Sequence, residues 1–304
     1  MSTPKDFSPA APLPLDEFGA LASESPAPPA DASPDPDNPP WEISSAVGVW
    51  IISVALLFVM PIPFIIPYVL LKGIRFEALG QFLTTDKTAI FLQILAIIPV
   101  HLLTLAAAWA VITHFGKRPF FWRALGWSWS EQFDARKGII LGVVLFGVGA
   151  LIQVFFGGQE TQIDKIVASS RATAYLTAFL ATFTAPLVEE VVYRGLLYSA
   201  LQKAFGVRWG IISVLALFTL VHVPQYWSNF GVIAAVGILS AALTIVRAYS
   251  GRLLPCFIIH LIFNGITSVL IILQPYLQRF GSHSDGQKAA GLLCFARALL
   301  RAFI

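Results

Sequence analysis

Seven long apolar runs limit what this chain can fold into. Each is close to the roughly 20 residues that a helix needs to cross a bilayer. The chain is 57% hydrophobic and 12% charged, about half the charge of a soluble globular protein. The sequence therefore predicts an all-α, polytopic transmembrane helix bundle. The runs lie at residues 46–71, 89–114, 137–157, 173–200, 209–227, 230–247 and 253–274.

The two ends of the chain differ from these runs. Residues 1–44 hold 11 of the 20 prolines, with eight acidic residues against one basic residue. Because such a composition buries too little apolar surface to offset the entropy of ordering, we expect a disordered Pro/Ala/acidic tail there and a transmembrane helical domain over 45–304. Residues 288–304 carry Arg297 and Arg301. This segment is either an eighth span or an interfacial helix, so seven or eight spans are predicted.

Charge within the apolar runs is sparse, and such residues are usually functional because they are costly in a membrane. Glu189 lies 14 residues before Lys203, and His222 lies 14 residues after Arg208. A short loop joins these two runs, so they are antiparallel, and both side chains lie ~21 Å from the same membrane face. Away from the ends of the runs, the acidic, basic and histidine residues within them are His101, Glu189, Glu190, Arg194, His222 and His260.

The last of the seven runs starts from that same face. His260 and Asn264 follow Arg252 by 8 and 12 residues, which places them ~12 and ~18 Å deep. Three runs thus bring Glu189, His222, His260 and Asn264 to similar depth. His101 stands apart from this group, and we interpret it as a hydrogen-bonded core histidine.

Helix geometry indicates different roles for the two adjacent glutamates, because their side chains point in different directions. Glu189 and Glu190 point about 100° apart, whereas Glu190 and Arg194 are spaced i, i+4 and share a face. We predict that Glu190 and Arg194 form an internal ion pair that supports the helix, because an isolated buried charge is prohibitive. Glu189 is then free to face a cavity. Phe218 shares a face with His222 and is predicted to pack beneath it.

The four residues at similar depth supply the groups that amide hydrolysis needs. A carboxylate and an imidazole that converge on one water can deprotonate it. A second imidazole and an amide N–H can donate to the oxyanion that develops. Glu189, His222, His260 and Asn264 together predict a hydrolase that needs no metal or other cofactor.

A zinc site is the alternative chemistry for the same residues. One carboxylate and two imidazoles form a common zinc ligand set, with water at the fourth position. Here the ligands would be Glu189, His222 and His260. The local HExxH signature is absent, so we favour the metal-free hydrolase.

Three short motifs give the chain a family resemblance. They are EExxxR at Glu189–Arg194 (EEVVYR), FxxxH at Phe218–His222 (FTLVH) and HxxxN at His260–Asn264 (HLIFN). Over about residues 137–274 the sequence resembles the type II CAAX prenyl endopeptidases, which are grouped with the CPBP (Abi) membrane proteins. The resemblance implies that Glu189 and His222 activate water and that His260 and Asn264 form the oxyanion site.

The resemblance also implies a class of substrate. Eukaryotic members of the family remove the last three residues of prenylated CAAX proteins, whereas some bacterial members process peptide precursors. We therefore expect an intramembrane protease acting on peptide or lipidated-protein substrates, integral to a bacterial cytoplasmic membrane. No basic run suggests a nucleic-acid partner. The alternatives are a non-enzymatic bacteriocin-immunity or scaffold membrane protein and, less favoured, a transporter with a Glu–His proton relay.

Overall fold

The computed structural model describes residues 35–115, 117 and 120–281, and all regular structure in these residues is helical. Within them, six helices are long and apolar enough to cross a membrane. The described part of the chain is thus all-α, and the chain is an integral membrane protein, as predicted. The predicted number of seven or eight spans is not confirmed, and residues 288–304 lie outside the described residues. The six helices are Ile43–Lys72, Lys87–His114, Ala135–Phe156, Arg171–Tyr226, Phe230–Ser250 and Leu254–Leu273.

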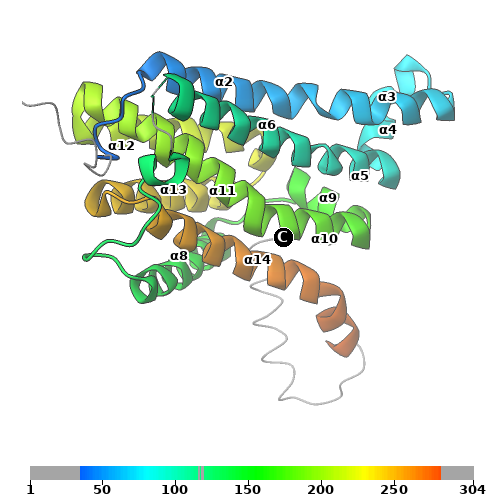
Figure 1. The fold of residues 1–304 in the computed structure, drawn as a ribbon. Helices are drawn as coiled ribbons and strands as arrows, with labels where there is room; N and C mark the ends of the chain where they lie inside the picture. Colours follow the sequence, from blue (N-terminus) through cyan, green and yellow to red (C-terminus); the bar gives the residue numbers. More distant parts are fainter. Residues whose placement is uncertain (1–34, 116, 118–119, 282–304) are drawn as a thin grey trace, which may run out of the picture. The chain divides into compact units, whose positions relative to one another are not determined.

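The first two membrane helices are each built from shorter elements. The first comprises α2 (Ile43–Val59) and α3 (Pro61–Lys72), which meet at Met60. Pro61 has no N–H to donate, so the hydrogen-bond ladder is interrupted there. After α4 (Phe76–Thr85), the second comprises α5 (Lys87–Leu95), α6 (Ile97–Ala110) and most of the π-helix η2 (Val111–Phe115). The short helix α7 (Phe121–Ala124) follows. In Figure 1, α2 and α6 run side by side.

The longest helical stretch folds back on itself at Gly206, whose backbone angles are φ 82° and ψ 164°. A Cβ on Gly210 would lie only 3.1 Å from the Cβ of Gln202. The rings of Tyr193 and Phe218 are 5.0 Å apart, although 25 residues of straight helix span ~37 Å. The two predicted runs are therefore antiparallel. The stretch consists of α10 (Arg171–Phe179), the π-helix η3 (Leu180–Thr184), α11 (Ala185–Glu189), the π-helix η4 (Glu190–Leu197) and α12 (Tyr198–Tyr226).

Three further helices complete the bundle: α8 (Ala135–Phe156), α13 (Phe230–Ser250) and α14 (Leu254–Gly281). They pack through a shared apolar cluster that includes Leu145, Leu243 and Ile259. Gly142 lets α8 and α14 approach closely, because a Cβ there would lie 2.8 Å from the Cβ of Ile262. A short helix, α9 (Gln162–Ser169), lies between α8 and α10 in the chain.

The segment before α2 differs from the tail expected over residues 1–44. Trp41 is only 3% exposed, and its Nε1–H donates to the Leu196 carbonyl of η4 at 3.3 Å. Asp37 forms an ion pair of 2.6 Å with the buried Arg247 of α13. Residues between 36 and 41 of the predicted tail therefore contact the bundle, and helix α2 already begins at Ile43. Composition alone could not reveal these contacts with distant side chains.

Candidate active site

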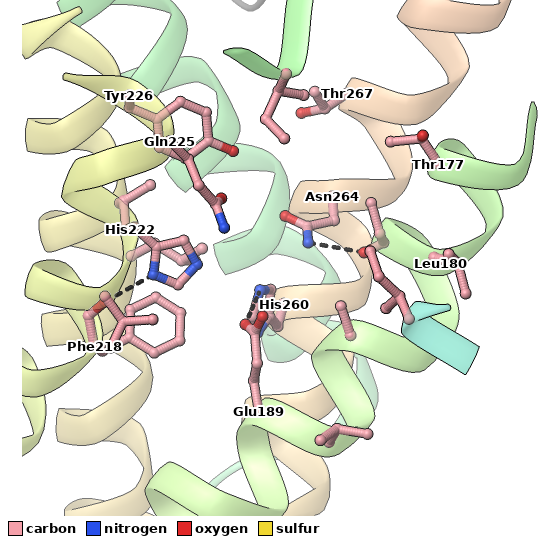
Figure 2. Close-up of a pocket in the computed structure, with 18 of the residues that line it drawn as sticks. Thr177, Leu180, Glu189, Phe218, His222, Gln225, Tyr226, His260, Asn264 and Thr267 are labelled. Atoms are coloured by element: carbon pink, nitrogen blue, oxygen red, sulfur yellow. Dashed lines mark hydrogen bonds and ion pairs between the residues drawn. The ribbon is translucent and has the colours of Figure 1, made fainter. Parts of the chain in front are cut away.

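A cavity of about 330 Å³ lies inside the bundle. Its wall includes Glu189, His222, His260 and Asn264, so the structure brings together the four residues predicted from depth and motif (Figure 2). They come from α11, α12 and α14. A cavity of this size is large enough for a small ligand or a short peptide segment.

The predicted ion pair of Glu190 and Arg194 is present. Their closest atoms are 3.1 Å apart, and both side chains are fully buried. Arg194 also donates to the carbonyl and the hydroxyl of Ser240, each at 3.0 Å, and to Thr244 at 3.3 Å. Its guanidinium lies 4.6 Å from the centre of the Phe218 ring. The Arg194 guanidinium therefore contacts residues of α13 and α12 as well as Glu190.

Glu190 has a second contact that the sequence did not reveal. Its Oε1 lies 2.8 Å from Nδ1 of His260, so one carboxylate oxygen serves both Arg194 and the imidazole. Nε2 of His260 lies 3.7 Å from Oε2 of Glu189. Glu190 therefore orients the His260 ring toward Glu189 and the cavity. The contact joins η4 to α14, and no spacing within either segment predicts it.

Glu189 faces the cavity, as its direction on the helix predicted. Its side chain is 26% exposed, whereas that of Glu190 is fully buried. Figure 2 shows its carboxylate directed toward His260. Glu190 is thus held through Oε1 by Arg194 and His260, whereas Glu189 is accessible from the cavity.

His222 is fixed by the backbone of its own helix. Its Nδ1 lies 2.7 Å from the carbonyl oxygen of Phe218, so Nδ1–H donates and the Nε2 lone pair is left for the cavity. Its ring packs 4.5 Å from that of Phe218, in line with the predicted packing role of Phe218. In Figure 2 it faces Glu189 and His260 from the opposite wall. An ion-pair contact within 4 Å joins Glu189 to His260, and none joins it to His222 among the described residues.

Asn264 is held by a carbonyl that a proline leaves free. In η3 the N–H of Ala185 bonds to the Leu180 carbonyl, five residues back. The next bond in that register would run from Pro186 to Ala181, but proline has no N–H. The Ala181 carbonyl instead accepts from Nδ2 of Asn264 at 2.8 Å. One N–H of the amide is thereby occupied, and the second remains for another acceptor.

Several cavity residues were not predicted as site residues. His101 lines the cavity, and its Nδ1 lies 2.9 Å from the Thr184 hydroxyl, which agrees with a hydrogen-bonded histidine. The others are uncharged or lie outside the apolar runs, so a search for charge within the runs passes over them. They include Gln153, Thr161, Asp164, Gln225, Tyr226 and Asn229.

The zinc alternative considered above would use Glu189, His222 and His260 as ligands. No three His, Cys, Asp or Glu side chains in the described part of the chain are placed to hold a metal ion. Nδ1 of His222 and Nδ1 of His260 are both engaged with protein oxygens, and their rings lie on different walls (Figure 2). With Nδ1 engaged in this way, Nε2 is the ring nitrogen left for a ligand, as it is in metal-ligating histidines, so the choice between a metal-free and a zinc mechanism stays a prediction.

The residues that line this cavity lie largely in a segment that matches a known protein family. The model of the family described as type II CAAX prenyl endopeptidase Rce1-like matches residues 171–266. The resemblance to this family is confirmed. The matched segment contains all three motifs and lies inside the core expected over 137–274. Neither the curated proteins nor the solved structures contain a match to the chain.

Proposed function

We propose that this chain is an intramembrane endopeptidase that uses water activated at Glu189. The observation that carries the proposal is the different treatment of two adjacent glutamates. Glu190 is buried against Arg194 and His260, while Glu189 opens onto a cavity shared with two imidazoles and an amide. The family match supports peptide-bond hydrolysis as the reaction.

The first step is the attack of water on the carbonyl carbon of the substrate. Glu189 takes a proton from the water, and the water oxygen adds to the carbonyl carbon. His222 presents the Nε2 lone pair to the cavity because its Nδ1–H is bound to the Phe218 carbonyl. That lone pair can accept a hydrogen bond from the same water and orient it.

The second step is collapse of the tetrahedral intermediate. The free N–H of Asn264 and an N–H at Nε2 of His260 are the donors that we propose for the oxyanion. The C–N bond then breaks, and the proton held by Glu189 passes to the departing amine. The products are a new carboxyl group and a new amino group, and Glu189 returns to its carboxylate form.

The cavity wall supports an apolar or lipidated substrate. Most of the wall is apolar, including Leu57, Ile97, Val100 and Ile271. A surface of this kind suits a lipidated or strongly apolar segment better than a polar peptide. We therefore favour prenylated CAAX-type proteins or other membrane-bound peptide precursors as substrates.

We also propose that the chain crosses the membrane seven times within its described part. The Arg171–Tyr226 stretch counts as one apolar helix of 56 residues, which would extend ~84 Å if straight. A bilayer core is about 30 Å thick. The reversal at Gly206 divides the stretch into two crossings and accounts for its length.

The test is turnover of a prenylated CAAX-type peptide by the purified protein in lipid nanodiscs. We expect release of the C-terminal tripeptide, detected by mass spectrometry, with unchanged rates in the presence of a chelator. Activity that is lost in chelator and restored by zinc would favour the zinc hydrolase. Binding of the peptide without any cleavage would favour the non-enzymatic scaffold.

A further inference from the structure

Gln153 presents an unpaired amide at the wall of the cavity. It lies in the last turn of α8 and is only 4% exposed. Its side chain lines the cavity, and neither Oε1 nor Nε2 has a hydrogen-bond partner among the described residues. A buried amide without partners costs stability, most of all inside a membrane. The protein retains a donor and an acceptor here that its own fold does not use.

Two glycines make room for this amide. A Cβ on Gly231 would lie 2.7 Å from Oε1 of Gln153, and one on Gly157 would lie 3.2 Å from the same atom. Gly231 is the second residue of α13, and Asn229 caps that helix by accepting from the Val232 N–H. The amide is thus confined between the end of α8 and the start of α13. Any side chain at Gly231 would displace it.

The amide belongs to a polar end of the cavity. Here the loop after α8 meets the loop after α12. The Gln159 N–H donates to the Ser228 carbonyl at 3.2 Å, and the Ser228 hydroxyl donates to the Glu160 carbonyl at 2.9 Å. No hydrogen bond or ion pair links this end to Glu189 or His260 within the described residues. The polar end consists of Gln153, Thr161, Asp164, Tyr226 and Asn229.

We propose that Gln153 binds the peptide backbone of the substrate. A primary amide offers an N–H donor and a carbonyl acceptor side by side, which complements the C=O and N–H of a peptide unit. Nε2–H would donate to a substrate carbonyl, and Oε1 would accept a substrate N–H. The apolar part of the substrate would occupy the remaining wall. This assignment rests on the proposed function, and it names a binding residue rather than a residue of the hydrolytic step.

The test compares Gln153→Leu with the wild type on the prenylated CAAX-type peptide. We expect KM to rise about five- to tenfold, the loss of one or two hydrogen bonds, with kcat within about twofold. The melting temperature should be equal or higher, because the variant removes an unpaired buried amide. A purely structural role at the start of α13 predicts the opposite, namely a lower melting temperature with unchanged KM.

The matched control is Thr219→Val. The Thr219 hydroxyl is likewise buried without a partner, but Thr219 does not line the cavity. We expect this variant to leave KM unchanged. A rise in KM equal to that of Gln153→Leu would mean that removal of any unpaired polar atom impairs binding, and it would overturn the assignment.

A substrate scan locates the bond that Gln153 makes. Each backbone amide of the peptide is replaced in turn by an ester, which removes one N–H donor. At one position the ester should weaken binding to the wild type and leave Gln153→Leu unaffected. Equal effects on both proteins at every position would overturn the assignment while leaving the proposed function intact. A wild type that cleaves none of these peptides would overturn both.

Discussion

Glu189 and Glu190 are neighbours in the chain, but they meet different surroundings. Oε1 of Glu190 binds both the Arg194 guanidinium and Nδ1 of His260. Charge-assisted hydrogen bonds of this kind are strong where water is excluded. Glu190 therefore acts as a positioning residue for His260, in addition to its predicted role as the partner of Arg194. Glu189 keeps access to the cavity, where we propose that it meets the substrate.

The Arg194 side chain gives the first prediction. Arg194→Met leaves Glu190 charged and buried, so we expect a loss of about 3–5 kcal/mol in the free energy of unfolding. Denaturant unfolding of the two proteins in detergent measures this difference in free energy. The control is the double variant Glu190→Gln/Arg194→Met, which removes both charges and should lose less than the sum of the two single variants. A single variant that unfolds like the wild type would show that the ion pair does not support the fold.

At the scale of elements, the sequence was sufficient to predict the helical hairpin, meaning the two antiparallel runs that meet at Gly206. A short loop between two apolar runs requires reversal, and a fixed rise per residue converts sequence distance into depth. That reasoning placed Glu189 and His222 at one level, and both line the same cavity. It also separated Glu189 from Glu190, because adjacent residues on a helix point in different directions.

Other features of the elements could not be predicted from the sequence. The free Ala181 carbonyl depends on a π-helical register in η3 that meets Pro186, and its partner Asn264 comes from α14. The bond from Glu190 to His260 likewise joins residues 70 positions apart. Such contacts are set by how the helices pack, and local periodicity carries no information about them. Gln153 was missed because it bears no charge.

The start of α9 gives the second prediction. Asp164 closes a capping box with Thr161, and burial raises the pKa of its carboxyl against the opposing hydrogen bonds from Thr161. The folded state therefore holds the proton more tightly than the unfolded state. This contribution to stability is fully present below the ordinary pKa of 3.8 and is lost as pH rises through the folded pKa.

The measurement is the melting temperature of the wild type and of Asp164→Asn between pH 7 and pH 4. The difference should shift in favour of the wild type as pH falls, because Asn cannot bind the proton. Other carboxyl groups titrate in both proteins and cancel in the difference. Parallel melting curves across this range would contradict the prediction.

At the scale of the whole molecule, the hairpin determines the topology. The Ser228 hydroxyl bonds to the Glu160 carbonyl, so the loops after α8 and after α12 meet at one face. The turn at Gly206 lies at the other end of α12. The seven crossings that we propose would therefore place Ala204 and Ser228 on opposite sides of the membrane.

Cysteine labelling tests this topology. Ala204→Cys and Ser228→Cys, each made after replacement of Cys256 and Cys294, introduce thiols at two exposed positions. A membrane-impermeant maleimide added to intact cells should label one variant and not the other. Labelling of both from the same side would contradict two crossings in the Arg171–Tyr226 stretch.

The central claim is that the Glu189 carboxylate activates the water. The most direct test is the rate of peptide cleavage by Glu189→Gln, which keeps the shape of the side chain and removes its basicity. The control is Glu77→Gln, a change at an exposed glutamate of α4 outside the cavity. We expect kcat to fall roughly 10²- to 10⁴-fold in Glu189→Gln, with an unchanged melting temperature and peptide affinity, and wild-type rates in the control. Wild-type cleavage by a folded Glu189→Gln protein would contradict the account.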